Sequence, residues 1–358
     1  MNEALLRTAN SGGFQLLGLA DFPGQGSAFV GILDAFWESK GLVTPEKFRE
    51  SCGPTVLLAR LPKRTYAPAE TFTARMDIYH FGPQRISGQR LAWRLEDETG
   101  QVLAQGKLKG KNVETATVDS LGEISVPLSA VHRPGKYTLK ACLGEVRNEW
   151  DIWVYPETDE ATTAPVNIAR EWNDRVRQDL EEGKDVLLIP DATPGRKTKF
   201  ASHFWNPIMF NWNPMIVGTL IAADHPAFAD FPTDTYADWQ WWDILNHARA
   251  LEMNRLTMVT PLVQSIDSYE TNHKLGIVFE AHIGKGRLLV AAIDREKDLE
   301  QRPATRQLFR SFIRYMQSDR FAPAATVPSY LLDELFSAGT DNKDDKAPNA
   351  AMLQLLNK

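Results

Sequence analysis

Cysteine is nearly absent from this sequence, whose 358 residues include only Cys52 and Cys142. Two cysteines cannot build a disulfide scaffold or supply a four-cysteine metal site. The formal net charge of −6 argues against the basic surface of nucleic-acid-binding proteins. No apolar run reaches the ~18 residues of a membrane span, and the first residues lack a basic stretch followed by an apolar one. We therefore expect no nucleic-acid partner, no membrane span and no signal peptide in this sequence.

The sequence also lacks the short motifs of common catalytic and cofactor sites. It contains no G-x-S-x-G elbow and no glycine-rich phosphate-binding or dinucleotide-binding loop after a strand. The seven histidines are scattered, without a pair at H-x-x-x-H spacing. Nothing in the sequence indicates that Ser202, His203 and Asp294 meet as a triad. We assign no catalytic residue, no metal ligand and no cofactor.

Hydrophobic residues make up 43% and charged residues 24% of the chain, as in soluble globular proteins with real cores. The first 53 residues contain an apolar run, Phe14–Leu19, which is typical of a buried strand. A loop rich in glycine and proline follows. From Ala28 the apolar residues recur at helical spacing, at positions 29, 33, 36 and 37. Residues 1–53 are therefore predicted to form a strand, a loop and a helix.

Polar side chains follow the carboxyl end of this predicted strand. A carboxylate, a ring and an amide at that position suit hydroxyl recognition, because ligands of parallel barrels bind at the carboxyl ends of the strands. The alternative is a loop in which Asp21 lies near a helix start and stabilises the helix dipole. The predicted substrate-binding residues are Gln15, Asp21, Phe22 and Gln25.

Apolar residues alternate with polar ones in several short segments between residues 54 and 156. Examples are residues 72–79, 90–96, 124–128, 137–143 and 150–154. About seven short strands at this spacing are typical of an immunoglobulin-like β-sandwich. A polar linker is expected at residues 157–164.

Helical and strand patterns mix in residues 165–321, which predicts an α/β domain. We expect strands near 185–190, 216–221, 261–267, 275–282 and 286–293, and helices near 168–182, 236–247 and 303–318. Residues 322–358 are predicted to be a loose tail that ends in a short helical segment.

Aromatic residues are dense in this α/β domain. Two interpretations stay open: a core with an interface, or a patch that contacts carbohydrate or a partner, since a ring face complements a sugar face. In the segment 238–243, Trp239 and Trp242 share one helix face and Trp241 points elsewhere. The residues selected for the patch are Trp205, Trp212 and Trp241.

The order of these parts resembles the C-terminal portion of glycoside hydrolase family 2, the superfamily of β-galactosidases, β-glucuronidases and β-mannosidases. The segments Gly12–Leu17 and Asp21–Gly26 resemble the last strand and loop of its (β/α)8 (TIM) barrel, and Leu33–Gly41 resembles the last barrel helix. Asn148–Pro156 is similar to the closing strand of the sandwich in bacterial members. Ala227–Asp234 and Trp239–Trp242 are similar to a C-terminal flavodoxin-like or amidotransferase-like domain.

This resemblance implies the C-terminal segment of a retaining β-glycosidase that acts on β-linked glycans. The two catalytic glutamates, which stand about 5 Å apart in such enzymes, would lie on absent barrel strands, so this chain alone is expected to be inactive. Its implied partners are a carbohydrate substrate, the missing N-terminal part of the enzyme and further copies in an oligomer. The implied location is periplasmic or secreted.

Two other functions stay open. One is a non-catalytic carbohydrate-binding or assembly module, and the other is a hydrolase or esterase in the α/β domain. We also expect Phe14, Leu16, Phe29, Phe36 and Trp37 to be exposed if nothing packs on the opening segment.

Overall fold

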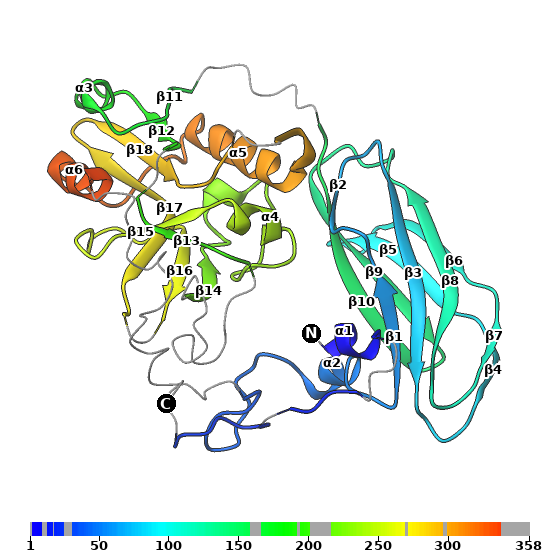
Figure 1. The fold of residues 1–358 in the computed structure, drawn as a ribbon. Coiled ribbons are helices and arrows are strands. Elements are labelled where there is room, and N and C mark those ends of the chain that lie inside the picture. Colours follow the sequence, from blue (N-terminus) through cyan, green and yellow to red (C-terminus); the bar gives the residue numbers. More distant parts are fainter. Residues whose placement is uncertain are drawn as a thin grey trace, which may run out of the picture. The chain divides into compact units, whose positions relative to one another are not determined.

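The computed structural model describes residues 2–8, 13–16, 18–24, 31–157, 166–191, 194–200, 216–268, 271–295 and 299–337. The chain divides into two compact units, unit 1 (Met1–Glu157) and unit 2 (Thr158–Lys358), shown in Figure 1. The strands outnumber the helices, so the β-rich content of the predicted fold class agrees with the structure. In the described part of the chain, no helix is both long and apolar enough to cross a membrane.

Unit 1 is built mainly on antiparallel strand pairs. The three-stranded sheet has the order β1 (Thr55–Arg60), β3 (Thr71–His80), β8 (Thr117–Pro127). The five-stranded sheet has the order β2 (Thr65–Tyr66), β10 (Val146–Val154), β9 (Gly135–Leu143), β5 (Ala92–Asp97), β6 (Val102–Lys107). A separate pair consists of β4 (Ile86–Gln89) and β7 (Lys111–Val113).

The alternation read from the sequence produces the core of this unit. In β3, Phe72, Met76 and Ile78 are fully buried. They belong to one apolar cluster with Leu139 of β9 and Ile152 of β10, in the other large sheet. Since successive side chains of a strand point to opposite faces, the period of two places one face of each sheet in a shared core.

The opening segment does not form the predicted strand and helix. Among its described residues, β-pairing is limited to bridges such as the parallel bridge between Ala20 and Leu33. Its described helices are the short α1 (Asn2–Leu6) and α2 (Pro45–Arg49). The predicted final unit of a TIM barrel is therefore not shown.

A local side-chain interaction explains why residues 31–40 are not helical. The Asp34 carboxylate accepts hydrogen bonds from the backbone N–H groups of Phe36 (2.8 Å) and Glu38 (2.9 Å). Aspartate side chains that bind nearby backbone groups in this way compete with the helical hydrogen-bond pattern. Trp37 also has a φ of 68°, outside the helical region. Leu16, Phe36 and Trp37 are exposed as expected, but Phe14 is half-buried against the cluster of Leu6, Val56 and Leu58. Phe29 lies outside the described residues.

Unit 2 contains a mixed sheet. Its main path has the order β11 (Ile168–Ala169), β12 (Val186–Leu188), β18 (Gly286–Ala291), β17 (Lys274–Ile283), β15 (Arg249–Glu252), β13 (Arg196–Lys197). Off this path, β16 (Val263–Asp267) pairs with β17 and with β14 (Ile216–Ile221). The strands β11, β12 and β18 run parallel to one another, and the other described pairs are antiparallel.

Helices cover both faces of this sheet. Residues of α3 (Asp174–Glu181) and α6 (Ser329–Ser337) share a core cluster with Phe279 of β17. On the opposite face, Tyr315 of α5 (Pro303–Met316) donates a hydrogen bond of 2.8 Å to Glu280. The shorter helices are η1 (Pro226–Phe228), α4 (Trp241–Asn246) and η2 (Leu299–Gln301).

Two predictions for this region need correction. Among the described strands of unit 2, only β11, β12 and β18 are mutually parallel, so the structure does not show a flavodoxin-like or amidotransferase-like domain, whose sheet is mostly parallel. Residues 322–337 are not a loose tail, because α6 buries Leu331, Leu332 and Leu335 in the core of unit 2.

Candidate functional site

The four substrate-binding residues predicted in the opening segment do not form a described site together. Asp21 accepts hydrogen bonds from Lys40 Nζ (2.6 Å) and from the backbone N–H of Gly31 (2.9 Å). The hydrogen bond from Lys40 lowers the pKa of the Asp21 carboxyl, which is therefore ionised and engaged within the chain. Phe22 and Gln15 are exposed, and Gln25 lies outside the described residues.

The predicted aromatic patch is wrong for Trp241. This side chain is fully buried and packs edge-on against Phe228 and Phe231. Its indole N–H donates to Thr233 Oγ1 at 2.8 Å, so the buried polar atom is satisfied. Trp205 and Trp212 lie outside the described residues.

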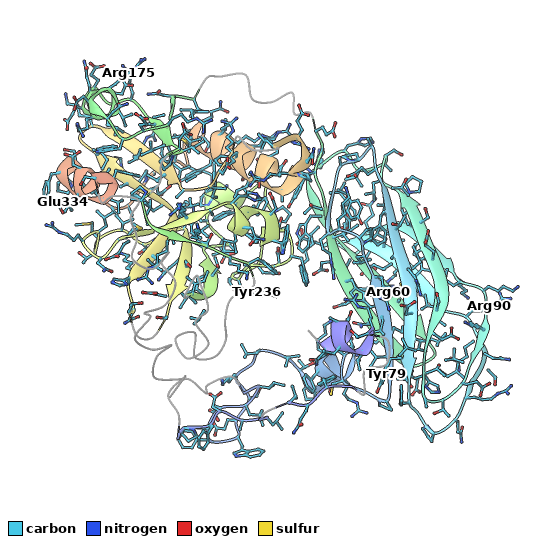
Figure 2. The ribbon with its side chains drawn as sticks, viewed as in Figure 1. Arg60, Tyr79, Arg90, Arg175, Tyr236 and Glu334 are labelled. Atoms are coloured by element: carbon cyan, nitrogen blue, oxygen red, sulfur yellow. The ribbon has the colours of Figure 1, made fainter. Side chains whose placement is uncertain are left out.

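The neighbours of Trp241 lie at the surface instead. Tyr236, Trp239 and Trp242 are 60%, 52% and 53% exposed. We call these three residues the aromatic ledge. Tyr236 is labelled in Figure 2 and forms an antiparallel bridge with Leu220 of β14, which is also exposed. The ledge joins the start of α4 to this strand of the sheet.

Buried contacts fix the backbone under the ledge. Gln240 is almost fully buried, and its side-chain amide donates to the carbonyl of Pro232 (2.7 Å) and to Asp238 Oδ2 (3.1 Å). The backbone N–H of Trp241 donates to the carbonyl of Asp238 at 3.0 Å. Trp239 lies in the turn before α4 and Trp242 in the first turn of the helix, where the backbone N–H of Trp242 donates to the carbonyl of Trp239 at 3.3 Å.

Polar groups continue this surface along α4. Asn246 is exposed and follows Trp242 by four residues, which places both on one helix face. His247 Nδ1 lies 2.9 Å from the backbone carbonyl oxygen of Asp243, which orients the imidazole, and 3.1 Å from Asp243 Oδ1. Exposed rings beside amide and carboxylate groups can stack on a sugar and bind its hydroxyls.

The sequence contained the signal for the ledge. The spacing of Trp239 and Trp242 separates them from Trp241, but the pattern does not say which helix face meets the core. The structure decides this, because Phe228 and Phe231 pack on Trp241.

The described residues offer no metal centre. Within the ranges given above, no three His, Cys, Asp or Glu side chains converge as metal ligands would. The two cysteines lie in unit 1 and do not form a disulfide.

The family model described as Domain of unknown function (DUF8488) matches residues 70–156, and the one described as Domain of unknown function (DUF8487) matches residues 167–337. No curated protein matches the chain.

Solved structures resemble only small parts of the chain. An alkylpurine DNA glycosylase of Pseudomonas fluorescens is 11% identical over 28% of this chain and 30% of its own, with a TM-score of 0.24. A β-glucosidase of Erythrobacter marinus is 8% identical over 28% of this chain and 15% of its own, with a TM-score of 0.23. A β-glucuronidase of Parabacteroides merdae is 8% identical over 39% of this chain and 21% of its own, also with a TM-score of 0.23. Likeness at this level carries no argument about function.

These comparisons correct the predicted family. The matching family models are two domains of unknown function, and neither a family 2 model nor a curated relative supports membership in glycoside hydrolase family 2. The chain is instead similar to DUF8488 in its sandwich and to DUF8487 in its mixed-sheet unit.

Proposed function

We propose that this chain is a non-catalytic carbohydrate-binding module and that the aromatic ledge of unit 2 is its binding surface. The observation that carries the proposal is the exposure of Tyr236, Trp239 and Trp242 over a buried, hydrogen-bonded foundation. Rings held in this way lose little conformational freedom when a ligand binds, which favours affinity.

The chemistry of the ledge suits sugars better than purely apolar ligands. The rings supply stacking faces, and Asp238 and Asn246 supply hydrogen-bonding groups close in sequence to the tryptophans. Neither cysteine is in unit 2, so this unit itself contains no thiol nucleophile. Binding without turnover is the simplest function for this arrangement.

A glycan array followed by isothermal titration calorimetry tests the proposal. We expect binding to at least one neutral β-linked glycan, and we expect Trp239→Ala and Trp242→Ala each to weaken it by about tenfold or more, or ~1.4 kcal/mol. Tyr330→Ala is a matched control, because Tyr330 is a 54% exposed aromatic residue on α6 in the same unit. Absence of glycan binding, or equal binding by all three variants, would refute the proposal.

A second function, assembly with another chain, is favoured by the surface of the opening segment. Phe36, Trp37 and Leu42 are 84%, 69% and 73% exposed. Large exposed apolar side chains close together mark interaction surfaces. We interpret the sandwich of unit 1 as immunoglobulin-like, and the segment as its attachment to a partner or to a second copy.

Sedimentation velocity over a range of concentrations tests this assembly. We expect self-association, and we expect Phe36→Ser to reduce it while Val118→Ser, at a 42% exposed position on β8, has no effect. Two results together would rule the assembly role out. The chain would be a monomer at every concentration, and no partner would bind the wild type but fail to bind Phe36→Ser.

A further inference from the structure

A polar pocket of about 420 Å³ lies in unit 2 at the carboxyl ends of β11, β12 and β18. Arg170 directly follows β11, Asp191 lies just beyond β12, and Asp294 and Arg295 lie just beyond β18. Because these three strands are parallel, the residues after them meet at one edge of the sheet. Such edges are the usual ligand sites of open α/β sheets. We call this the strand-end pocket.

Backbone hydrogen bonds hold its walls in place. The N–H of Asp191 donates to the carbonyl of Arg170 at 3.0 Å, which joins the ends of β11 and β12. The N–H of Asp294 donates to the carbonyl of His247 at 2.8 Å, which joins the end of β18 to the residue after α4. The N–H of Arg249 donates to the carbonyl of Ala292 at 2.9 Å. The pocket is thus formed by the sheet itself and does not depend on one loop.

Positive charge is in excess in this pocket. Among the described residues, its lining includes four cationic side chains and two carboxylates: Arg170, Lys197, Arg249 and Arg295 against Asp191 and Asp294. This excess contrasts with the net charge of −6 of the whole chain. A concave site lined mainly by one sign of charge concentrates ligands of the opposite sign.

Two of the arginines contact uncharged groups. Arg249 donates to the carbonyl of Gly195 at 2.6 Å, a neutral acceptor. Arg295 lies over the ring of Phe309, with 5.6 Å between the guanidinium carbon and the ring centroid. Burial, and then the nearby charge of Arg170, lower the pKa of the Arg295 guanidinium. An anion between the two guanidiniums would relieve this repulsion.

Arg170 also contacts Asp191, at 3.4 Å, but the Asp191 side chain is 60% exposed. Exposed pairs of this kind contribute only ~0–1 kcal/mol, so a ligand oxyanion can compete for the guanidinium. Carboxylate and phosphate groups match the planar donor fork of arginine with two parallel hydrogen bonds.

We propose that the strand-end pocket binds the carboxylate or phosphate group of a small anionic ligand. Arg170 and Arg295 hold the oxyanion, and Lys197 and Arg249 add attraction from the same lining. This inference goes beyond carbohydrate binding by the ledge and does not depend on it. The two sites are nevertheless close, because Asn246 lines the pocket and is about 6 Å along α4 from Trp242. An acidic sugar is therefore a ligand that both sites accept together.

Calorimetric titration of the full chain with inorganic phosphate, glucuronate and glucose tests the proposal. Glucose is the neutral control for glucuronate, since the two differ by the carboxylate. We expect phosphate or glucuronate to bind, glucose to bind at least tenfold more weakly than the better anion, and binding to weaken when ionic strength rises from about 0.01 M to about 0.1 M. Phosphate binding without glucuronate binding indicates a phosphorylated ligand, and the reverse indicates a carboxylate ligand.

Charge-neutralising variants identify the site. We expect Arg170→Gln and Arg295→Gln to weaken anion binding by about tenfold or more, and Asp191→Asn to strengthen it, because it removes a competing carboxylate. Arg175→Gln is the control, because Arg175 is an exposed arginine on α3, labelled in Figure 2, that does not line the pocket. If Arg295→Gln lowers the melting temperature without ligand, its weaker binding could reflect a loss of folding. The comparison of anion binding by Arg170→Gln and Arg175→Gln then decides whether the pocket is the site.

Binding of neither anion, or equal binding by Arg170→Gln and Arg175→Gln, would overturn the proposal. The ledge is tested separately, because Trp239→Ala is expected to leave phosphate binding unchanged. Loss of glycan binding in that variant with intact phosphate binding supports both sites. Glycan binding by a chain that binds neither anion supports the ledge alone.

Discussion

Replacement of Asp267 by asparagine should destabilise unit 2 strongly. The carboxylate is 1% exposed and pairs with Arg196, whose side chain is 6% exposed. It also accepts hydrogen bonds from the backbone N–H groups of Ser268 (2.8 Å) and His273 (2.7 Å) and from Thr271 Oγ1 (2.8 Å). The variant keeps the size of the side chain but removes its charge and replaces one acceptor oxygen by a donor.

The magnitude follows from the burial of both partners. Removing one member of a buried ion pair costs about 3–5 kcal/mol, because the other charge stays desolvated without its counter-charge. For a unit of this size, each kcal/mol lowers the melting temperature by about 2–4 °C, so the expected decrease is about 6–20 °C. The affected elements are β13, which carries Arg196, and the connection from β16 to β17.

Differential scanning calorimetry measures the change, and hydrogen exchange of peptides covering residues 263–283 locates it. The matched control is Asp191→Asn, which makes the same substitution in an exposed ion pair with Arg170. We expect the control to change stability by less than about 1 kcal/mol. Equal melting temperatures for the two variants, or unchanged exchange in residues 263–283, would refute the assignment of a stabilising buried pair.

Three further predictions concern unit 2. Hydrogen bonds from the His273 backbone and Thr271 and the charge of Arg196 outweigh burial and lower the pKa of Asp267. The ionised Asp267 carboxylate should therefore stabilise the fold above pH 3.8, its ordinary pKa, and this stabilisation should be lost as the pH falls from there through the folded pKa. In chemical denaturation, acid should accordingly reduce the difference in free energy of unfolding between wild type and Asp267→Asn. Trp241→Ala should cost about 3–5 kcal/mol and Trp242→Ala less than about 0.5 kcal/mol in the same assay, because only the first ring is in the core. Gly195→Ala should lower the free energy of unfolding by about 1–3 kcal/mol, because the φ of Gly195 is +120° and the added carbon would lie 2.3 Å from a carbonyl oxygen of β15. Gly218→Ala, whose added carbon makes only an ordinary 3.5 Å contact, should be less destabilising in thermal unfolding.

The strands and helices that the sequence predicted best have strong internal patterns. The alternation in residues 72–79 became β3, and the predicted strand at 216–221 coincides with β14. The predicted helix at 303–318 became α5, residues 303–316. In β3 and α5 most apolar residues are buried, so the local period and the tertiary packing favour the same structure.

The opening segment shows where such patterns fail. Its apolar residues recur at helical spacing, but Phe36 and Trp37 have no core to face and are exposed. The Asp34 side chain then binds the backbone instead. Local patterns also failed to predict the packing of α6, which was expected to belong to a loose tail. Its leucines can be assigned to the core only from the tertiary structure, where they share a cluster with Phe279.

The candidate sites divide in the same way. The residues of the ledge are close in sequence, and their spacing already separated Trp239 and Trp242 from Trp241. The strand-end pocket could not be predicted, since Arg170, Asp191, Arg249 and Arg295 come from four segments that only the sheet brings together. The sequence by itself determined the β-rich character of unit 1, the main strands of unit 2 and the absence of common catalytic motifs, because these depend on local spacing and composition. Only the tertiary structure decided which aromatic rings are buried and which charges converge, because both depend on contacts between residues far apart in the chain.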